Sequence, residues 1–378
     1  MGARADTVLI VGGGPAGLAT ALELRRRHIA AVVIERSAYE DRRIGEHLTP
    51  QGVLDLKAID PTLLDQAGVH SESAGVTAYW GSEIANHTDY FLHPGQRGLN
   101  LLRPLFDADL ARAAESSGVT ILRLSSLKRA VRRNDVWQVD IDRDGSTDHV
   151  AASFVVDATG RSAAFSRQQG AKICAHDRQV AIVAFQDGAD DAYLNTRSIV
   201  EAVESGWWYF APINARRSIC MFVTDVDLLP SGAKQELRAW WHDQLSQAVH
   251  VPRRFQSLVH RRNFFIRSAR SQCLDVPIGL GWLAVGDAAI AFDPLASQGI
   301  VKALDHGKRA AASICAFLKG EDLSLERFAL HLRYEYAAFH AMKAKYYRLE
   351  QRWPQSVFWQ RRTTIAISPT YSENYLAR

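Results

Sequence analysis

Three glycines near the N-terminus have the spacing of a phosphate-binding turn: Gly12, Gly14 and Gly17 lie between an apolar run and a helical pattern. The first glycine permits a tight turn, the second lets the backbone approach a pyrophosphate, and the third lets helix and strand pack closely. The N–H groups at the start of the helix, which contains Pro15 and Ala16, would then face the phosphates. The motif predicts that the chain binds a dinucleotide.

Glu35 lies at the end of the next apolar run, where a carboxylate can accept hydrogen bonds from a ribose. The elements that must position these residues are also indicated. TVLIVGGG and AAVVIERS are typical of strands, and the apolar side chains of residues 15–29 repeat near the helical period. We therefore expect a βαβ unit at the N-terminus, with the glycines in its first turn and Glu35 after its second strand.

A second motif, GDAAIAFDPLASQG, occupies residues 286–299 and follows the apolar run GWLAV. Asp287 in this position can bind a ribityl hydroxyl, and Pro294 interrupts the chain. Gln298 and Gly299 begin a new helix, whose N–H groups could stabilise negative charge on a reduced flavin ring. A nicotinamide cofactor needs no second motif so far downstream, whereas FAD is long enough to need one. The pair of motifs favours FAD.

A polar cluster, RIGEHLTP, follows the βαβ unit and contains Arg43, Gly45, Glu46 and His47. It could be a solvated loop, but its position favours a loop folded over a cofactor. Thr49 is a good N-cap for a helix that begins near residue 51. The acid or base candidates are Glu46, His47, His87 and His93.

These motifs occur in the order seen in FAD-dependent aromatic hydroxylases and flavin-dependent tryptophan halogenases: GGGPAG with Glu35, then RIGE, then DATGR at residues 157–161, then GDAAIAFDP. The chain resembles this superfamily over most of its length. The resemblance implies an α/β fold in which a Rossmann-type FAD-binding domain is interleaved with a β-sheet substrate domain, as in p-hydroxybenzoate hydroxylase. The expected limits are residues 1–75, 98–170 and 275–320 for the FAD-binding domain, 76–97 and 171–274 for the substrate domain, and 321–378 for a helical C-terminal segment.

The resemblance also implies roles for individual residues. Arg43 and Arg103 would lie near the FAD phosphates or ring, Asp287 would hold the ribityl chain, and Gln298 would lie against the isoalloxazine. Glu46, His47 and Gln298 are the catalytic candidates, and no metal-ligand spacing stands out. The complete set predicted to bind the cofactor is Gly12, Gly14, Pro15, Ala16, Gly17, Glu35, Arg36, Arg43, Gly45, Arg103, Asp157, Gly160, Gly286, Asp287, Pro294, Gln298 and Gly299.

Both activities of the superfamily begin with a flavin hydroperoxide, and the sequence favours oxygen transfer over halogenation. Halogenases pass hypohalous acid to a lysine in the stretch after the first βαβ unit, but this chain has no lysine between Lys57 and Lys128. Their WxWxIP segment is only partly matched by WWYFAP, in which Trp207 and Pro212 agree and Tyr209 does not. We interpret Trp207, Tyr209 and Pro212 as substrate-binding residues, although an aromatic strand at a domain interface would have the same pattern.

The reductant is left open. Hydroxylases that bind NADPH themselves carry an Asp-Gly pair in mid-chain, and DATG replaces it here. NAD(P)H could reduce the flavin directly, or a separate flavin reductase could supply it.

The C-terminal segment AKYYRLEQRWPQSVFWQRR narrows the resemblance to LodB-like flavoproteins, which help to hydroxylate a tryptophan in quinone-cofactor oxidases or dehydrogenases. The implied substrate is a tryptophan in the precursor of such a partner. A halogenase, a small-molecule aromatic hydroxylase and an FAD-bound docking factor without oxygen chemistry are the alternatives.

Residues 333–362 hold seven basic residues against two glutamates, although the whole chain has a net charge of only +4. This tail could dock on an acidic partner, or it could be a solvated helical face, and we expect no nucleic-acid partner. No apolar run approaches the ~20 residues that span a bilayer. The N-terminus lacks a cleavable signal pattern, and the four scattered cysteines suggest neither a zinc site nor a disulfide framework. We expect a cytoplasmic protein.

Overall fold

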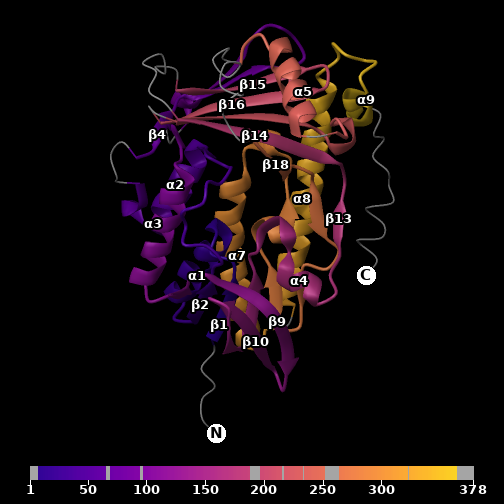
Figure 1. Cartoon of the computed structure of the whole chain (residues 1–378). Coiled ribbons are helices and arrows are strands. Elements are labelled where there is room, and N and C mark those ends of the chain that lie inside the picture. The colour runs from indigo at the N-terminus through magenta and orange to yellow at the C-terminus, as the bar shows by residue number, and fades with distance from the viewer. Residues whose placement is uncertain are drawn as a thin grey trace.

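The computed structural model describes residues 7–64, 69–93, 97–187, 196–214, 217–232, 234–251, 264–321 and 323–363. A mostly parallel sheet with the order β20-β21-β12-β1-β2-β8 forms the half of the molecule nearest the N-terminus (Figure 1). Its pairs are parallel apart from β20–β21. The strands are β1 (Thr7–Val11), β2 (Ala30–Ile34), β8 (Thr120–Leu122), β12 (Phe154–Asp157), β20 (Ile278–Gly279) and β21 (Trp282–Ala284).

The central strands of this sheet are nearly continuous apolar runs because helices cover them, as in other parallel sheets. Helix α1 (Pro15–Arg26) joins β1 to β2 as predicted and packs along α7 (Gly299–Leu318). The two helices approach closely, since a Cβ added to Gly307 would lie 2.6 Å from the Cβ of Ala19. Helices α2 (Pro50–Ile59), α3 (Arg103–Ser116) and α4 (Ala164–Gln168) complete this part.

A second sheet has the order β18-β14-β17-β16-β15-β5-β6 and lies at the opposite end of the molecule (Figure 1). Strand β16 (Gly206–Asn214) is buried on both faces. Its Trp208 and Phe210 pack with Trp241 of α5 (Lys234–Gln247), whereas Trp207 and Tyr209 face the core shared with the C-terminal helices. The other strands are β5 (Gly75–Tyr79), β6 (Asn86–Asp89), β14 (Gln179–Asp187), β15 (Arg197–Val203), β17 (Arg217–Asp225) and β18 (Phe265–Ser268).

Three small sheets complete the fold. One contains β3 (His47–Leu48), β7 (Gly98–Asn100) and β4 (Ser71–Ser73), and another contains β9 (Ser125–Arg133), β10 (Val136–Arg143) and β11 (Ser146–Ala152). The third contains β13 (Ile173–Ala175), β19 (Gln272–Leu274) and β22 (Ile290–Ala291), where Cys174 lies opposite Cys273 without a disulfide between them. Their separation in the chain concealed this proximity from the sequence analysis.

The C-terminal helices join the two halves. Helix α8 (Ser324–Arg348) runs from the parallel-sheet half to the second sheet in Figure 1. Its first half contributes Phe328 and Leu332 to the core of the parallel sheet, and Tyr347 near its end joins the core beneath the second sheet together with Phe358 of α9 (Val357–Thr363). The predicted α/β fold with a helical C-terminus is confirmed, while residues 364–378 of that segment lie outside the described residues.

The exact domain limits stay a prediction. Across the described ranges, no helix combines the length and apolar character needed to span a bilayer.

Candidate active site

The three motif glycines at the first βα turn occupy different environments. Gly12 has a φ of +110°, and a Cβ there would lie 2.3 Å from the carbonyl oxygen of Ala158. A Cβ on Gly17 would lie 2.0 Å from the carbonyl oxygen of Gly12, so this glycine permits the close packing of helix and strand. A Cβ on Gly14 would meet nothing within 4 Å. The open side of Gly14, with Pro15 and the first N–H groups of α1 beside it, fits a pyrophosphate.

Glu35 is buried beside this turn and is held as a carboxylate. Its oxygens accept hydrogen bonds from the N–H of Gly13 at 2.8 Å and from the N–H and hydroxyl of Ser37. Burial would raise the pKa of Glu35, but the Ser37 and Gly13 hydrogen bonds and the positive charge of Arg43 outweigh it and lower the pKa. An ionised acceptor at the end of β2 fits a ribose. The neighbouring side chain of Arg36 is exposed.

Asp107 links the RIGE segment to helix α3, and the sequence analysis missed it. Arg43 donates to Asp107 at 3.3 Å as well as to Glu35 at 3.1 Å. Arg103 makes a two-pronged bond to the same Asp107 at 3.1 Å and also donates to the carbonyl oxygens of Ile44 and Gly45. The predicted arginines are therefore brought together around one buried carboxylate, and RIGE is a fixed loop, not a solvated one.

Asp157 has a less direct place than its motif suggested. Its carboxylate accepts hydrogen bonds from the N–H and hydroxyl groups of Thr159 and Ser166. It therefore shapes the turn that places Ala158 against Gly12, and any role in cofactor binding would act through that turn. Gly160 follows with a φ of +65°.

The second motif presents Asp287 between two cations. Lys302 of α7 is buried and donates to Asp287 at 2.8 Å and to the carbonyl oxygen of Ile290, while Arg161 lies 3.5 Å from the other carboxylate oxygen. Burial would raise the pKa of Asp287, but Lys302 and Arg161 outweigh it and lower the pKa. The carboxylate stays ionised and half-buried, which fits a hydrogen bond from a ribityl hydroxyl.

A buried histidine fixes the Gly286 turn from behind. The Nδ1 of His306 accepts the N–H of Gly286 at 3.0 Å, so its Nε2 carries the proton and donates to Glu335 at 2.6 Å. Burial lowers the pKa of His306, which keeps it neutral in this arrangement. Helix α8 thus supports the cofactor motif through Glu335, a contact for which the sequence gives no signal.

The helix start after Pro294 is accessible. Ser297 has a φ of +50°, Gln298 is the N-cap of α7, and both Gln298 and Gly299 are exposed. A Cβ on Gly299 would meet nothing within 4 Å. The placement of the flavin end of FAD against this open helix terminus stays a prediction, which the exposure of Gln298 and Gly299 fits. The observed carboxylates, open glycines and helix termini fit FAD as a set, and reduced FAD would supply electrons for oxygen activation.

Glu46 and His47 are buried between the small β3–β7–β4 sheet and the second sheet. A hydrogen bond of 2.7 Å joins His47 Nε2 to the hydroxyl of Tyr90, and Nδ1 lies 3.4 Å from the Asn100 side-chain oxygen. Burial lowers the pKa of His47, so it is neutral near pH 7. Thr49 caps α2 as predicted, accepting the N–H of Gly52 at 3.4 Å. The other two candidates, His87 and His93, are exposed.

The three residues predicted to bind substrate do not share one environment. Trp207 is buried and donates to the hydroxyl of Tyr347 at 3.0 Å, so it joins the strand to α8. Tyr209 lies on the same face of β16, near Glu46, and burial and the charge of Glu46 raise the pKa of Tyr209. Pro212 lies on the opposite face of β16, the face that also carries Trp208 and Phe210. Of the three, Tyr209 is the one placed beside a catalytic candidate.

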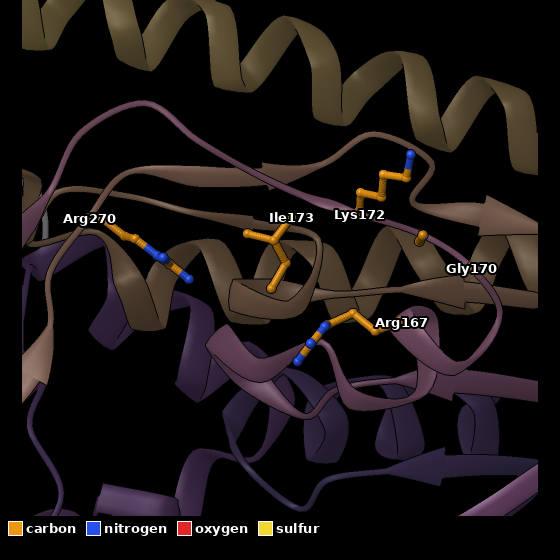
Figure 2. A pocket seen from close by; sticks show the side chains of 6 residues that line it. Arg167, Gly170, Lys172, Ile173 and Arg270 are labelled. Carbon is orange, nitrogen blue, oxygen red and sulfur yellow. The ribbon is translucent and has the colours of Figure 1, made fainter.

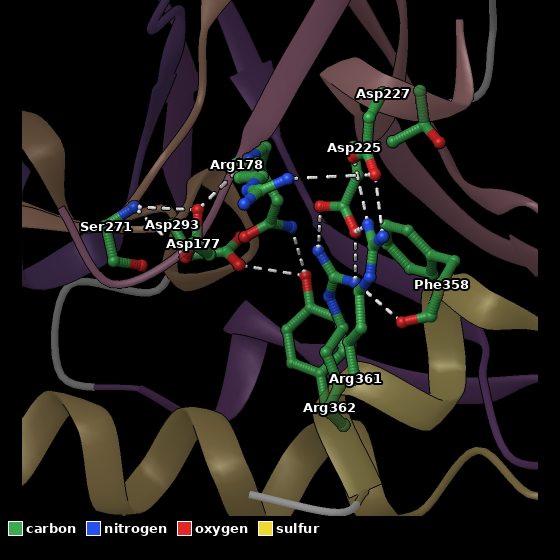
Figure 3. Close-up of polar contacts among 12 residues, drawn as sticks. Asp177, Arg178, Asp225, Asp227, Ser271, Asp293, Phe358, Arg361 and Arg362 are labelled. Carbon is green, nitrogen blue, oxygen red and sulfur yellow. Dashed lines mark hydrogen bonds and ion pairs between the residues drawn. The ribbon is translucent and has the colours of Figure 1, made fainter.

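A polar network joins α8 and α9 to Asp293 of the second motif and to the second sheet (Figure 3). Lys343 donates to Asp177 at 2.6 Å and lies 3.1 Å from Asp293, and Tyr347 also donates to Asp293, at 2.8 Å. Arg361 and Arg362 both pair with Asp225. With Arg352 paired to Glu350, at least four of the seven basic residues in the tail are neutralised within the fold. The docking interpretation of that charge is correspondingly weakened.

A basic hollow of about 600 Å³ lies apart from these residues, at the end of α4 (Figure 2). Arg167 and Arg270 extend toward Ile173 from opposite sides in that view. None of the residues that line it belongs to the predicted cofactor or substrate set. The hollow is connected to the cofactor motif through Arg161, which donates to the carbonyl oxygen of Arg270 and lies near Asp287.

Comparisons with known proteins agree with this geometry. The model of a family described as "FAD binding domain" matches residues 5–335. The FAD-dependent oxidoreductase LodB of Marinomonas mediterranea is 29% identical over 364 residues, which cover 94% of this chain and 96% of LodB. Two solved structures are similar in fold. The flavin-dependent halogenase CmlS has a TM-score of 0.85 at 22% identity, covering 100% of this chain and 71% of CmlS. The peptidyl tryptophan dihydroxylase QhpG, essential for tryptophylquinone cofactor biogenesis, has a TM-score of 0.79 at 23% identity, covering 95% of this chain and 79% of QhpG.

Proposed function

From the premise that this chain belongs to the FAD binding domain family and is an FAD-dependent oxidoreductase, we propose that it hydroxylates a tryptophan side chain in a partner protein. The similarity to LodB extends over nearly the whole of both chains. The fold of QhpG, which acts on a peptidyl tryptophan, supports a protein substrate. The partner would be the precursor of a quinone-cofactor oxidase or dehydrogenase.

The state of the buried lysines is the observation that favours oxygenation over halogenation. A halogenase needs an amine that can capture hypohalous acid, and the sequence has no lysine between positions 57 and 128. Near the second motif, Lys302 is bound to Asp287 and Lys343 lies between Asp177 and Asp293. The amine of each lysine is engaged by carboxylate or carbonyl oxygens within the fold, so neither is free to capture hypohalous acid.

Reducing equivalents would come from a separate flavin reductase that uses NAD(P)H. This chain lacks the mid-chain Asp-Gly pair of hydroxylases that bind NADPH themselves. The carboxylate of Asp157 instead accepts hydrogen bonds from the turn that it belongs to. This proposal expects NADH or NADPH alone to reduce the bound FAD slowly, and expects fast reduction once a flavin reductase is added.

The experiment that tests the function uses the purified FAD-loaded protein, a flavin reductase with NADH, oxygen and the unmodified precursor of the partner enzyme. Hydroxylation raises the mass of the tryptophan peptide by roughly 16 or 32 Da, the mass of one or two oxygen atoms. A docking factor without oxygen chemistry would bind the precursor and leave that mass unchanged.

Halogenation is the second candidate, favoured by the similarity in fold to CmlS. The same reaction in bromide or chloride buffer separates the two activities. A product with the isotope pattern of bromine or chlorine would support halogenation. A product that contains added oxygen and no halogen would exclude it.

A further inference from the structure

A group of polar side chains is buried where the β3–β7–β4 sheet meets the second sheet. It comprises Glu46, Tyr209, Ser198, Asn100 and Ser73, each at least 93% buried. Such groups are costly to bury unless hydrogen bonds replace those lost to water. Structural polar groups are normally paired, so the partners of each of these atoms indicate what the group does.

The outer part of the group is connected to the surface. The Tyr90 hydroxyl is hydrogen-bonded to His47 at 2.7 Å, and His47 in turn approaches Asn100. The ring of Tyr90 also packs edge-on against His93 with 6.0 Å between ring centres, and the His93 side chain is exposed. The Tyr90 hydroxyl and the His47 imidazole can each donate and accept a proton, and the ring of Tyr90 lies beside an exposed residue.

The inner part is less completely paired. The hydroxyl of Tyr209 is close enough to Glu46 and Ser198 for both to shift its pKa, but neither makes a hydrogen bond of good geometry with it. Within this group, four buried atoms have no hydrogen-bond partner among the described residues: Tyr209 Oη, Ser198 Oγ, Ser73 Oγ and Asn100 Nδ2. Leaving a buried polar group unpaired is costly, so a cluster of such groups indicates polar occupants such as water or a substrate group.

We propose that Glu46 and Tyr209 form the inner end of a proton path whose outer end is His47 and Tyr90, with water held between Ser73, Ser198 and Asn100. The proposal rests on the hydroxylation proposed above and assigns to Tyr209 a proton-transfer role in place of the substrate contact expected from the sequence. Gln298 would face the flavin at the separate start of α7.

The proposed chemistry requires such a path. Hydroxylation of an aromatic ring uses one O₂, two electrons from reduced FAD and two protons. One oxygen atom forms the new C–O bond as the C–H bond at that carbon breaks and its proton is released to a base. The other oxygen atom leaves as water. Glu46 is suited to accept the ring proton because a carboxyl group is a typical general base and this one lies close to the hydroxyl of Tyr209.

The test uses the holoenzyme without any aromatic substrate, so that it does not depend on the substrate assignment. FAD bound to the protein is reduced anaerobically with dithionite and mixed with oxygenated buffer in H₂O or D₂O, and its reoxidation is followed by absorbance. Tyr209→Phe and Tyr90→Phe are compared with the wild type, and Tyr346→Phe, an exposed tyrosine on α8, is the matched control. Melting temperature and FAD affinity are measured for every variant.

We expect Tyr209→Phe and Tyr90→Phe to reoxidise at least about tenfold more slowly, a smaller loss than the roughly 10²–10⁴-fold that general acid–base catalysis contributes, and to change the solvent isotope effect. FAD affinity should be unchanged in both variants. The Tyr346→Phe control should keep the wild-type reoxidation rate and isotope effect. Wild-type rates and isotope effects in both variants would overturn the proposal. Glu46→Gln, which keeps the side-chain size, replaces Tyr209→Phe if that variant does not fold, and the same outcomes apply. A wild type with intact proton transfer but no hydroxylated tryptophan would refute the proposed function and leave the proton path standing.

Discussion

Gly14 is the residue where cofactor binding can be separated from folding. A Cβ at Gly14 has free space on every side within 4 Å, whereas one at Gly17 would lie 2.0 Å from a backbone oxygen. We therefore expect Gly14→Val to fold and to lose at least about tenfold in FAD affinity, equivalent to ~1.4 kcal/mol, because the side chain occupies the pyrophosphate position. Fluorescence titration with FAD and thermal unfolding of the apoprotein measure the two effects.

Gly17→Val is the contrasting variant, and it should lower the melting temperature of the apoprotein itself. If Gly14→Val binds FAD as the wild type does, the phosphate-loop assignment is wrong.

Lys302 is a positioning residue that the motif-based analysis did not find, since a buried lysine on an amphipathic helix has no pattern of its own. Replacement by Met preserves the side-chain length and removes the charge beside Asp287. The pKa of Asp287 should rise, and FAD affinity should fall by about tenfold, or ~1.4 kcal/mol, because a ribityl hydroxyl donates better to a carboxylate than to a neutral acid. Titration of FAD fluorescence checks this.

Lys308→Met on the same helix is the control, since that side chain is exposed. Equal FAD affinity in the Lys302→Met variant and this control would mean that Asp287 does not bind the cofactor.

At the scale of elements, helix α8 holds the two sheets in one arrangement through the Lys343 network. Burial would raise the pKa of Asp177, but the charge and hydrogen bond of Lys343 outweigh it, and the pKa of this carboxyl lies below its usual value. A lowered pKa contributes stability that is present above the unfolded-state value of ~3.9 and is lost as the pH falls through the folded-state value. Lys343 should therefore stabilise the protein at neutral pH and not in acid.

We expect Lys343→Met to lower the free energy of unfolding by about 3 kcal/mol at pH 7, because removing one partner leaves buried carboxylates unpaired. The difference from the wild type should shrink below pH ~4. Urea unfolding at several pH values measures both, with the exposed Lys345→Met as control. A difference that stays constant down to pH 3 would contradict the role given to this ion pair.

At the scale of the whole molecule, local sequence patterns predicted the helices and strands. They did not predict the side-chain contacts between residues that are far apart in the chain. The βαβ unit, the Thr49 cap and the α/β fold with its helical end followed from periodicity, glycine spacing and family resemblance. Asp107, Lys302 and Glu335 could not be predicted, because each acts on a motif through side-chain contacts across the tertiary fold. The sequence pattern could predict that Trp207 is buried. It could not predict the hydrogen-bond partner of Trp207, because Tyr347 is 140 residues away in the chain.

The central claim is that this FAD-dependent protein transfers oxygen from O₂ to an aromatic ring of tryptophan. The most direct measurement is the reaction with the precursor protein under ¹⁸O₂, followed by peptide mass spectrometry. We expect each oxygen added to the tryptophan to carry the heavy isotope, about 2 Da heavier than with ordinary oxygen, because the cofactor activates O₂ and not water. A halogenated tryptophan, a tryptophan labelled only from H₂¹⁸O, or an unmodified tryptophan despite flavin turnover would contradict the claim.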